Sequence, residues 1–296
     1  MAATADHSDV ELEFRFFRVH KDGTIHRTHP TIDKVPPSDD PTTDVRSKDV
    51  TISTDPPISA RIFLPKSVHQ TKKLPVLLYL HGGGFCFESP CSSTYHNYVS
   101  TLAASANVIA VSVEYGLFPT RPIPPCYWAA LQWVATGGSE PWLNDYADLT
   151  RVFVGGDSAG GNIAHTLLFR VGSIGLPGAK VVGAVLVHPY FGGTDDDKMW
   201  LYMNKENEGL QDRRLVPATE DLRRLGCERV LVFVAEMDHL KGGGKRYVEE
   251  LKKSGWTGSV EVEETVGKDH CFHLAEPNDE LTTDLIKKMA SFSNLH

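Results

Sequence analysis

The sequence has little of what would indicate a secreted, membrane-spanning or nucleic-acid-binding protein. Its five cysteines are odd in number and scattered, and none form a CxxC pair, so neither a disulfide framework nor a thiolate metal site is expected. No apolar run reaches the roughly 18 residues that a membrane-spanning helix needs. With a formal net charge of -8 and no dense basic run, the chain lacks the positive surface that displaces counterions from nucleic acids. We therefore expect no membrane, nucleic-acid or metal partner.

The N-terminus also lacks the features of a signal peptide. Residues 1–30 contain acids and histidines where such a peptide would have a basic start and an apolar segment. Together with the scattered cysteines, this favours a reducing compartment, either the cytosol alone or the cytosol and the nucleus. The 296 residues, of which 41% are hydrophobic, are enough for one large core, and neither an internal repeat nor a low-complexity segment interrupts them. We therefore expect residues 1–296 to form a single domain.

The first part of the chain carries turn and loop signals. Residues 13–27, EFRFFRVHKDGTIHR, place a DG turn between two strand-like pieces, which predicts a hairpin. Residues 28–47 are rich in Pro, Asp and Thr and predict an extended surface loop, because proline cannot donate to a ladder of backbone hydrogen bonds.

From residue 48 onward, strand-like and helix-like segments alternate. Residues 74–81, LPVLLYLH, are apolar on both faces, as a strand covered by helices on each side requires. Similar apolar or alternating runs predict strands at 48–53, 58–65, 107–115, 151–156, 181–189, 229–236 and 259–266. Helix-period segments lie between them at 93–106, 126–135, 161–171, 243–255 and 279–294. This alternation predicts an α/β fold with a mostly parallel sheet.

The most informative motif is GDSAGGN at residues 156–162, between a buried-type strand and a helix. A serine in G-x-S-x-G at such a strand-to-helix turn takes strained backbone angles, and glycines on both sides leave room for it. Its hydroxyl is then exposed at the carboxyl edge of the sheet, where Ser158 could act as a nucleophile. The alternative is a glycine-rich turn in which the serine only caps the helix.

A second motif supports the nucleophile. HGGG at residues 81–84 follows a central strand, and consecutive glycines let backbone N–H groups approach a carbonyl oxygen. With the N–H of Ala159, those of Gly83 and Gly84 would form an oxyanion hole. A flexible loop or a phosphate cradle is the weaker interpretation, because no Gly-Lys-Ser/Thr follows.

A serine hydroxyl needs a base, and the base needs an acid that orients it. VFVAEMDHL places Asp238 just after one strand, and VGKDHCFHL places His270 just after the next. The other titratable residues near these motifs are weaker candidates for the acid and the base. Asp157 is expected to have a structural role, and the side chain of Glu236 is expected to face away from the turn that carries Asp238. His239 flanks the acid, and the remaining histidines are expected to pack at a helix start or in the core: His273, His165 and His188.

Several longer segments together resemble one known family. HGGGFCFES, GDSAGGN, HPYFGG, GCERVLVFVAE, LKKSGW and DHCFHL look like the plant carboxylesterase group in the hormone-sensitive-lipase branch of the α/β-hydrolases. The likeness runs from about residue 14 to the last helix. It implies an eight-stranded, mostly parallel sheet flanked by helices, with a small helical cap contributed by about residues 1–45 and 194–216.

The resemblance implies the same site residues. Ser158 is the nucleophile, His270 the base, Asp238 its orienter, and Gly83, Gly84 and Ala159 the oxyanion donors. From their positions beside the motifs, five further residues are expected to line the substrate pocket: Phe85, Tyr190, Phe191, Trp200 and Leu274.

The function expected is hydrolysis of small carboxylic esters, without metal or organic cofactor, by a monomer or a homodimer. Relatives resembling 2-hydroxyisoflavanone dehydratases leave a dehydratase or cyclase open, although some of these carry threonine where this chain has Ser158. A binding protein similar to the gibberellin receptor is also possible, but such receptors lack the histidine that His270 supplies here.

One segment departs from the family pattern. Relatives tend to read EYRLAPEHPxP and then YEDSWAAL, whereas residues 114–131 here read EYGLFPTRPIPPCYWAAL. Gly116 and Thr120 stand where charged residues are usual, and an acid before Trp128 is missing. We hypothesise that both sides of a buried charge cluster are lost together, which would lower the melting temperature and leave the site geometry intact.

Overall fold

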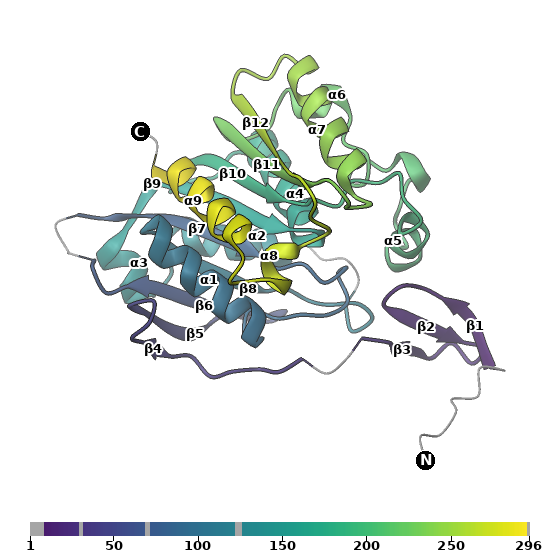
Figure 1. Cartoon of the computed structure of the whole chain (residues 1–296), viewed down its shortest axis with the longest axis horizontal. Coiled ribbons are helices and arrows are strands. Elements are labelled where there is room, and N and C mark those ends of the chain that lie inside the picture. Colours follow the sequence, from purple (N-terminus) through teal and green to yellow (C-terminus); the bar gives the residue numbers. More distant parts are fainter. Residues whose placement is uncertain (1–8, 30–31, 69–71, 122–125, 295–296) are drawn as a thin grey trace.

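A computed structural model describes residues 9–29, 32–68, 72–121 and 126–294 of the chain (Figure 1). Within these residues the main sheet has nine strands, in the order β12-β11-β10-β9-β7-β8-β6-β5-β4. Their bounds are β4 Asp39–Asp40, β5 Val45–Thr54, β6 Pro57–Pro65, β7 Leu74–Leu80, β8 Ile109–Glu114, β9 Ala147–Asp157, β10 Val181–Val187, β11 Arg229–Ala235 and β12 Ser259–Thr265.

The sheet is mostly parallel, as the alternation of strands and helices predicts. β8, β7, β9, β10, β11 and β12 run parallel to their neighbours, whereas β6, β5 and β4 add antiparallel pairs at one edge. The expected eight strands are β5 to β12. The ninth, β4, lies in the segment that was expected to be only a loop. Asp39 and Asp40 can pair with β5 because the nearby prolines flank these two residues.

Helices cover both faces of the sheet. They are α1 Ser93–Ala106, α2 Cys126–Ala135, α3 Pro141–Tyr146, α4 Ala159–Ile174, α6 Thr219–Leu222, α7 Lys241–Lys253, α8 Phe272–Ala275 and α9 Glu280–Asn294. β7 shows how its side chains divide between the layers. Val76, Leu78 and Leu80 belong to the core cluster that includes residues of α2, α4 and α7, and Leu77 and Tyr79 to the cluster that includes residues of α1 and α9. A strand buried on both faces must be apolar throughout, which is why this segment shows no polar alternation.

The N-terminal segment forms a second, small antiparallel sheet. Its strands are β1 Val10–Glu13, β2 Phe17–His20 and β3 Ile25–Arg27. The predicted hairpin is therefore present, with Phe17 opposite Arg27. The described part of residues 1–45, which is expected to contribute to a cap, contains strands and no α-helix. Period-two alternation of buried Phe17 and Val19 with more exposed neighbours explains the strand.

The second expected cap segment is helical. Residues 194–216 contain α5 Asp197–Met203 and the short 3-10 helix η2 Gly209–Gln211. The rings of Phe14 and Phe17 lie 5.2 Å and 5.8 Å from that of Tyr202 in α5, so this helix packs against the small sheet. Figure 1 shows β1, β2 and β3 next to α5, beside the carboxyl ends of the main strands.

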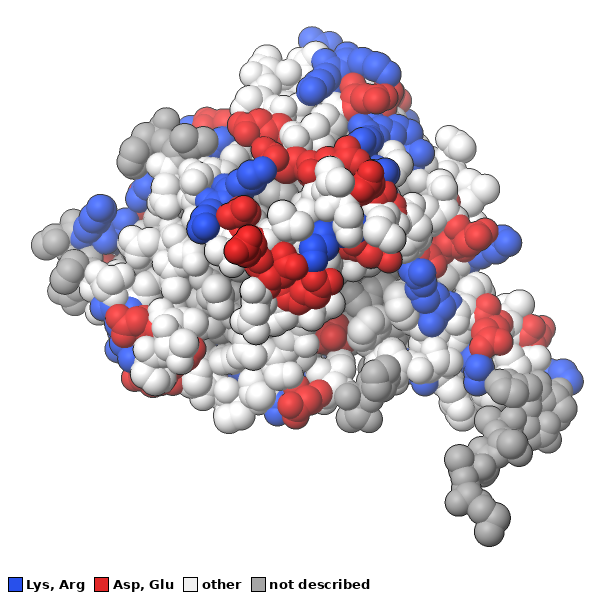
Figure 2. Space-filling model, viewed as in Figure 1, with Lys and Arg blue, Asp and Glu red and all other residues white. Residues whose placement is uncertain are grey.

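The surface mixes charges of both signs. On the face in Figure 2, Lys and Arg are interspersed with Asp and Glu. Glu263 and Glu264 of β12 pair with Lys288 and Lys245. Among the described residues, no helix has both the length and the hydropathy needed to cross a bilayer.

Candidate active site

Ser158 occupies a strained turn between β9 and α4. Its φ of 53° and ψ of −118° are unusual for a residue with a side chain. A Cβ on Gly156 would lie 2.5 Å from the carbonyl oxygen of Leu80, and a Cβ on Gly160 only 1.9 Å from it. Neither glycine could therefore carry a side chain without moving β7. The Ser158 N–H donates to the Val187 carbonyl oxygen at 2.9 Å, which ties the turn to β10.

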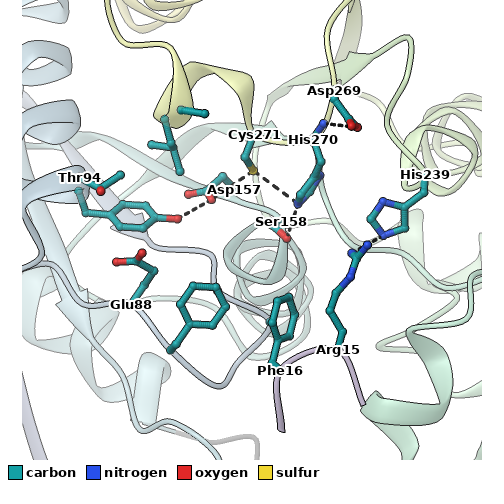
Figure 3. Close-up of a pocket in the computed structure, with 16 residues that line it drawn as sticks. Arg15, Phe16, Glu88, Thr94, Asp157, Ser158, His239, Asp269, His270 and Cys271 are labelled. Atoms are coloured by element: carbon teal, nitrogen blue, oxygen red, sulfur yellow. Dashed lines mark hydrogen bonds between the residues drawn. The ribbon is translucent and has the colours of Figure 1, made fainter. Parts of the chain in front are cut away.

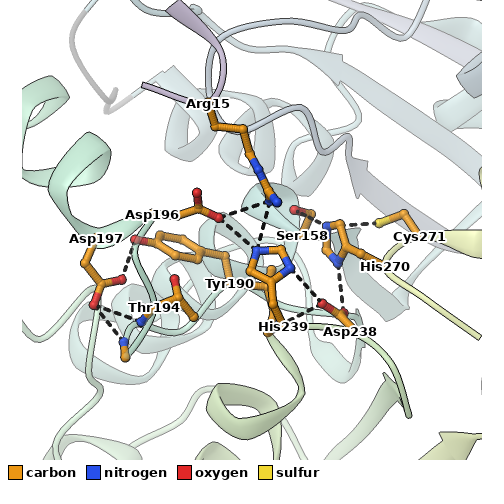
Figure 4. A network of polar contacts seen from close by, with 12 residues as sticks. Arg15, Ser158, Tyr190, Thr194, Asp196, Asp197, Asp238, His239, His270 and Cys271 are labelled. Carbon is orange, nitrogen blue, oxygen red and sulfur yellow. Dashed lines mark hydrogen bonds and ion pairs between the residues drawn. The ribbon is translucent and has the colours of Figure 1, made fainter. Parts of the chain in front are cut away.

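Three side chains that are far apart in the sequence meet at this turn. The Oγ of Ser158 lies 2.9 Å from the Nε2 of His270, and the Nδ1 of His270 lies 2.8 Å from the Oδ2 of Asp238 (Figure 4). They follow β9, β12 and β11, whose carboxyl ends lie at one edge of the sheet because these strands are parallel. The structure thus brings together the three residues that the sequence places after these strands.

Asp238 is held in one orientation and remains charged. Its side chain is buried, and its Oδ1 accepts the Leu240 N–H at 2.8 Å. Burial alone would raise its pKa, but the hydrogen bond and charge of His270 outweigh burial and lower the pKa of Asp238 below its usual range. Because a carboxylate only accepts hydrogen bonds, Nδ1 of His270 must donate, which leaves Nε2 able to accept the serine proton.

The glycine loop lies beside the serine. Gly83 and Gly84 have φ values of 95° and 55°, and the carbonyl oxygen of Gly83 accepts the N–H groups of Cys86 and Phe87. In the described part of the chain, no acceptor faces the backbone N–H of Gly83, Gly84 or Ala159. Such free amides beside a serine could bind a developing negative charge.

Two cavities share Ser158 and His270. The larger has a volume of about 560 Å³ and the smaller about 40 Å³. Figure 3 shows the larger one. The larger is lined by Arg15, Phe16, Gly83, Gly84, Phe87, Glu88, Thr94, Tyr95, Asp157, Ser158, His239, Asp269, His270, Cys271, Leu274 and Ala275. The smaller is lined by Arg15, Phe16, Gly84, Phe85, Ser158, Ala159, Tyr190, Asp196, Met199, Leu240 and His270.

Three of the five predicted pocket residues line these cavities. Phe85 and Tyr190 line the smaller cavity, and Leu274 the larger. The prediction is wrong for Phe191 and Trp200, which line neither.

Phe191 and Trp200 lie in the core for different reasons. The ring of Phe191 stacks on Tyr247 of α7 at 4.5 Å. Trp200 is 1% exposed because α5 turns it inward. The Arg214 guanidinium lies 5.3 Å from the centre of its ring. The preceding residue, Met199, lines the smaller cavity. Proximity to a motif in sequence therefore did not indicate which residues face the site.

Sequence reasoning missed the contribution of the N-terminal segment. Arg15 and Phe16 line both cavities. The Arg15 Nη1 lies 3.2 Å from Asp196 Oδ2 and 2.9 Å from His239 Nε2, and His239 Nδ1 lies 3.5 Å from Asp238 Oδ1 (Figure 4). This network joins the small sheet and the 194–216 segment to the acid beside His270. No local signal in the sequence marked Arg15, since only its distant partners give it this position.

The acids set aside in the sequence have structural contacts. Asp157 is buried and accepts the hydroxyls of Tyr79 at 2.9 Å and Tyr95 at 2.6 Å. Burial raises the pKa of Asp157 to about 6, although these hydrogen bonds oppose the shift. Glu236 accepts the Gly267 N–H at 2.8 Å and so joins the loop after β11 to the loop that carries His270.

His165, His188 and His273 are buried, as expected. Burial lowers the pKa of His165 and of His273 to about 3, and that of His188 well below its usual value. Donor atoms of His188, His270 and Cys271 lie within 4.8 Å of one another. However, His188 Nδ1 already accepts the Cys271 N–H at 2.9 Å, and His270 contacts Ser158 and Asp238, so a metal ion there would compete with the contacts of the site.

Comparisons with known proteins show the family of the chain. Residues 77–274 match the family described as alpha/beta hydrolase fold. The chain is 41% identical to probable carboxylesterase 1 of Arabidopsis thaliana, over 96% of this chain and 98% of that protein. It is 39% identical to 2-hydroxyisoflavanone dehydratase of Glycyrrhiza echinata, over 98% of both.

The chain is also similar to solved structures of esterases. The thermostable carboxylesterase EstE1, cloned from a metagenomic library, superposes with a TM-score of 0.70 at 28% identity, covering 84% of this chain and 88% of that one. An esterase of Pyrobaculum calidifontis superposes with a TM-score of 0.70 at 25% identity, covering 84% of each chain. The predicted fold class is thereby confirmed, and the chain belongs to the α/β-hydrolase fold family, as a carboxylesterase-like hydrolase.

Proposed function

We propose that the protein hydrolyses small carboxylic esters through Ser158, His270 and Asp238. The observation that carries this proposal is the 2.9 Å distance between Ser158 Oγ and His270 Nε2. The Nδ1 of the same imidazole is held by the buried carboxylate of Asp238. Both cavities open onto this hydroxyl, so an ester could place its two halves on either side of it.

The reaction would proceed in two halves. His270 Nε2 takes the proton of Ser158 as Oγ attacks the ester carbonyl carbon, and Asp238 stabilises the imidazolium that forms. His270 then gives this proton to the leaving alcohol as the carbon–oxygen bond breaks, which leaves Ser158 acylated. Water next attacks the acyl group with His270 again as base, and the acid and free serine are released.

The glycine loop would stabilise the charged intermediates. The N–H groups of Gly83, Gly84 and Ala159 would donate to the oxygen that becomes negative in both halves of the reaction. Loss of one such donor typically lowers kcat by about 10²–10³. This role needs no cofactor and no group from outside the chain.

The test is Ser158→Ala assayed with p-nitrophenyl acetate. We expect turnover to fall by at least about 10³-fold, since the nucleophile is lost. Ser173→Ala is the matched control, because Ser173 is an exposed residue later in the same helix and donates only to the Phe169 carbonyl. Unchanged turnover in purified Ser158→Ala would end the proposal.

A second candidate is a lyase, because a 2-hydroxyisoflavanone dehydratase aligns with nearly the whole chain. In that case His270 would move a proton of the substrate and no acyl-enzyme would form. A fluorophosphonate probe distinguishes the two, since covalent capture requires an activated serine. Labelling of Ser158, together with ester turnover, favours the hydrolase; dehydration of 2-hydroxyisoflavanone by an unlabelled protein favours the lyase.

A further inference from the structure

A carboxylate that lines the larger cavity has one oxygen without a partner. Glu88 lines this cavity, and its Oε2 is shielded from solvent. No hydrogen bond or ion pair reaches that atom from anywhere in the described ranges. A carboxylate oxygen withdrawn from water without a partner is unfavourable, and a positive charge in the adjoining cavity would offset part of that cost.

The backbone holds Glu88 next to the candidate oxyanion loop. Its φ is 74°, which is strained for a residue with a side chain. A Cβ built on Gly83 would lie 3.2 Å from the Cβ of Glu88, so the two residues are in close contact. The carbonyl of Gly83 also accepts the N–H groups of Cys86 and Phe87, so the same turn fixes the backbone just before Glu88.

The surroundings of Glu88 are aromatic. Phe16, Phe87 and Tyr95 line the same cavity, and the rings of Phe16 and Phe87 lie 5.0 Å apart. In Figure 3, Glu88 lies on the side of Thr94, across the cavity from Arg15 and His239. Aromatic faces beside a carboxylate are the environment that recognises organic cations.

The charges around the cavity also favour a cation. Asp157 and Asp269 line it together with Glu88, whereas the positive charge of Arg15 is paired with Asp196. These three carboxylates outnumber the guanidinium of Arg15, and an excess of one sign of charge in a cleft concentrates ligands of the opposite sign.

Cavity size indicates which part of the ester carries the cation. The smaller cavity, of about 40 Å³, suits a short chain such as an acetyl group. With the acyl part of the ester in this smaller cavity, the alcohol part would lie in the larger one, beside Glu88.

We propose that Glu88, with the rings of Phe16 and Phe87, recognises a positively charged ammonium group, and that the preferred substrates are short-chain esters of cationic alcohols. This substrate class rests on the proposed ester hydrolysis at Ser158. Glu88 is a specificity-determining residue in this proposal and takes no part in proton transfer.

The test compares acetylcholine with 3,3-dimethylbutyl acetate, its neutral isostere, so that only charge differs. For the wild type we expect kcat/KM to favour acetylcholine by roughly tenfold or more. Glu88→Gln should bring this ratio close to one. Glu280→Gln, which removes the same charge from an exposed position at the start of α9, should leave the ratio unchanged. A wild-type ratio near one, or a ratio that survives in Glu88→Gln, would overturn the proposal.

Two further measurements separate this inference from the function on which it rests. If the wild type hydrolyses no ester, including p-nitrophenyl acetate, the proposed function fails; calorimetric binding of choline to Ser158→Ala, with and without Glu88→Gln, still tests the cation site. Binding that requires Glu88 supports the site, and absence of binding refutes it. A Glu88-dependent preference for 2-hydroxyethyl acetate over propyl acetate, without a preference for acetylcholine, would replace the cation by a hydroxyl group and so contradict the proposal.

Discussion

The Nδ1 of His270 lies 2.8 Å from the Oδ2 of Asp238, whose side chain is closed to solvent, while the His270 ring remains 24% exposed. One end of the imidazole is therefore held in the protein and the other faces Ser158 and the cavity. Because Asp238 can only accept, it determines which ring nitrogen carries the proton.

Replacing this carboxylate should change the proton's position more than the fold. In Asp238→Asn the amide could donate to Nδ1, so Nε2 would carry the proton and could no longer accept from Ser158. We expect kcat for p-nitrophenyl acetate to fall by about 10³–10⁴ at pH 7. Glu236→Gln is the matched control, since a glutamine still offers an oxygen to the Gly267 N–H. Equal activity of Asp238→Asn and the wild type would contradict the proposed role of Asp238.

The turn around Ser158 should not tolerate a methyl group. In Gly160→Ala the new Cβ would lie 1.9 Å from the Leu80 carbonyl and 2.6 Å from that of His81, and backbone atoms of a central strand cannot move aside easily. We expect the free energy of unfolding to fall by at least about 3 kcal/mol, measured by urea denaturation. Gly242→Ala in α7 meets nothing within 4 Å and should be neutral or up to about 1 kcal/mol more stable. Similar stabilities for the two variants would show that the turn can relax.

Asp157 should make stability depend on pH in a defined direction. Burial raises its pKa from 3.8 to about 6 in the folded protein. Between these values the folded state keeps a proton that the unfolded state has lost, so the stabilisation is complete below about pH 4 and is lost as pH rises through about 6. Asparagine stays neutral throughout. The free energy of unfolding of the wild type, minus that of Asp157→Asn, should therefore fall by on the order of 2–3 kcal/mol as pH rises from 4 to 7.5.

Denaturant unfolding at several pH values measures this difference. Asp284→Asn, at an exposed carboxylate paired with Lys287, is the control and should give a small difference at every pH. If the free energy of unfolding of the wild type, minus that of Asp157→Asn, stays constant or rises with pH, the predicted direction is wrong.

The lower melting temperature expected from the altered segment at residues 114–131 remains a prediction. A Cβ on Gly116 would lie 2.2 Å from the Cδ of Arg121, so the side chain of Arg121 occupies the space beside this glycine. Trp128 is nearly buried and has the Arg170 guanidinium 4.6 Å from its ring. Residues 122–125 lie outside the described residues, and the predicted loss of stability is still to be measured against a relative.

Much of the candidate site could be predicted because its signals are local. Ser158 lies in a turn whose glycines are required by contacts with the adjacent strand, and such a turn leaves a recognisable pattern. Asp238 and His270 each follow a strand directly, so the parallel order of the sheet is enough to place them at one edge. The eight long strands are visible in the same way, whereas the two-residue β4 has no periodicity to detect.

What the sequence by itself determined was therefore the chemistry at the edge of the sheet, because that chemistry depends on residues next to strand ends. Only the tertiary structure decided what surrounds it. Arg15 reaches Asp196 and His239, Phe191 and Trp200 turn into the core, and Glu88 is left without a partner. These outcomes depend on how segments distant in the chain pack against one another, and no local pattern of residues encodes such a contact.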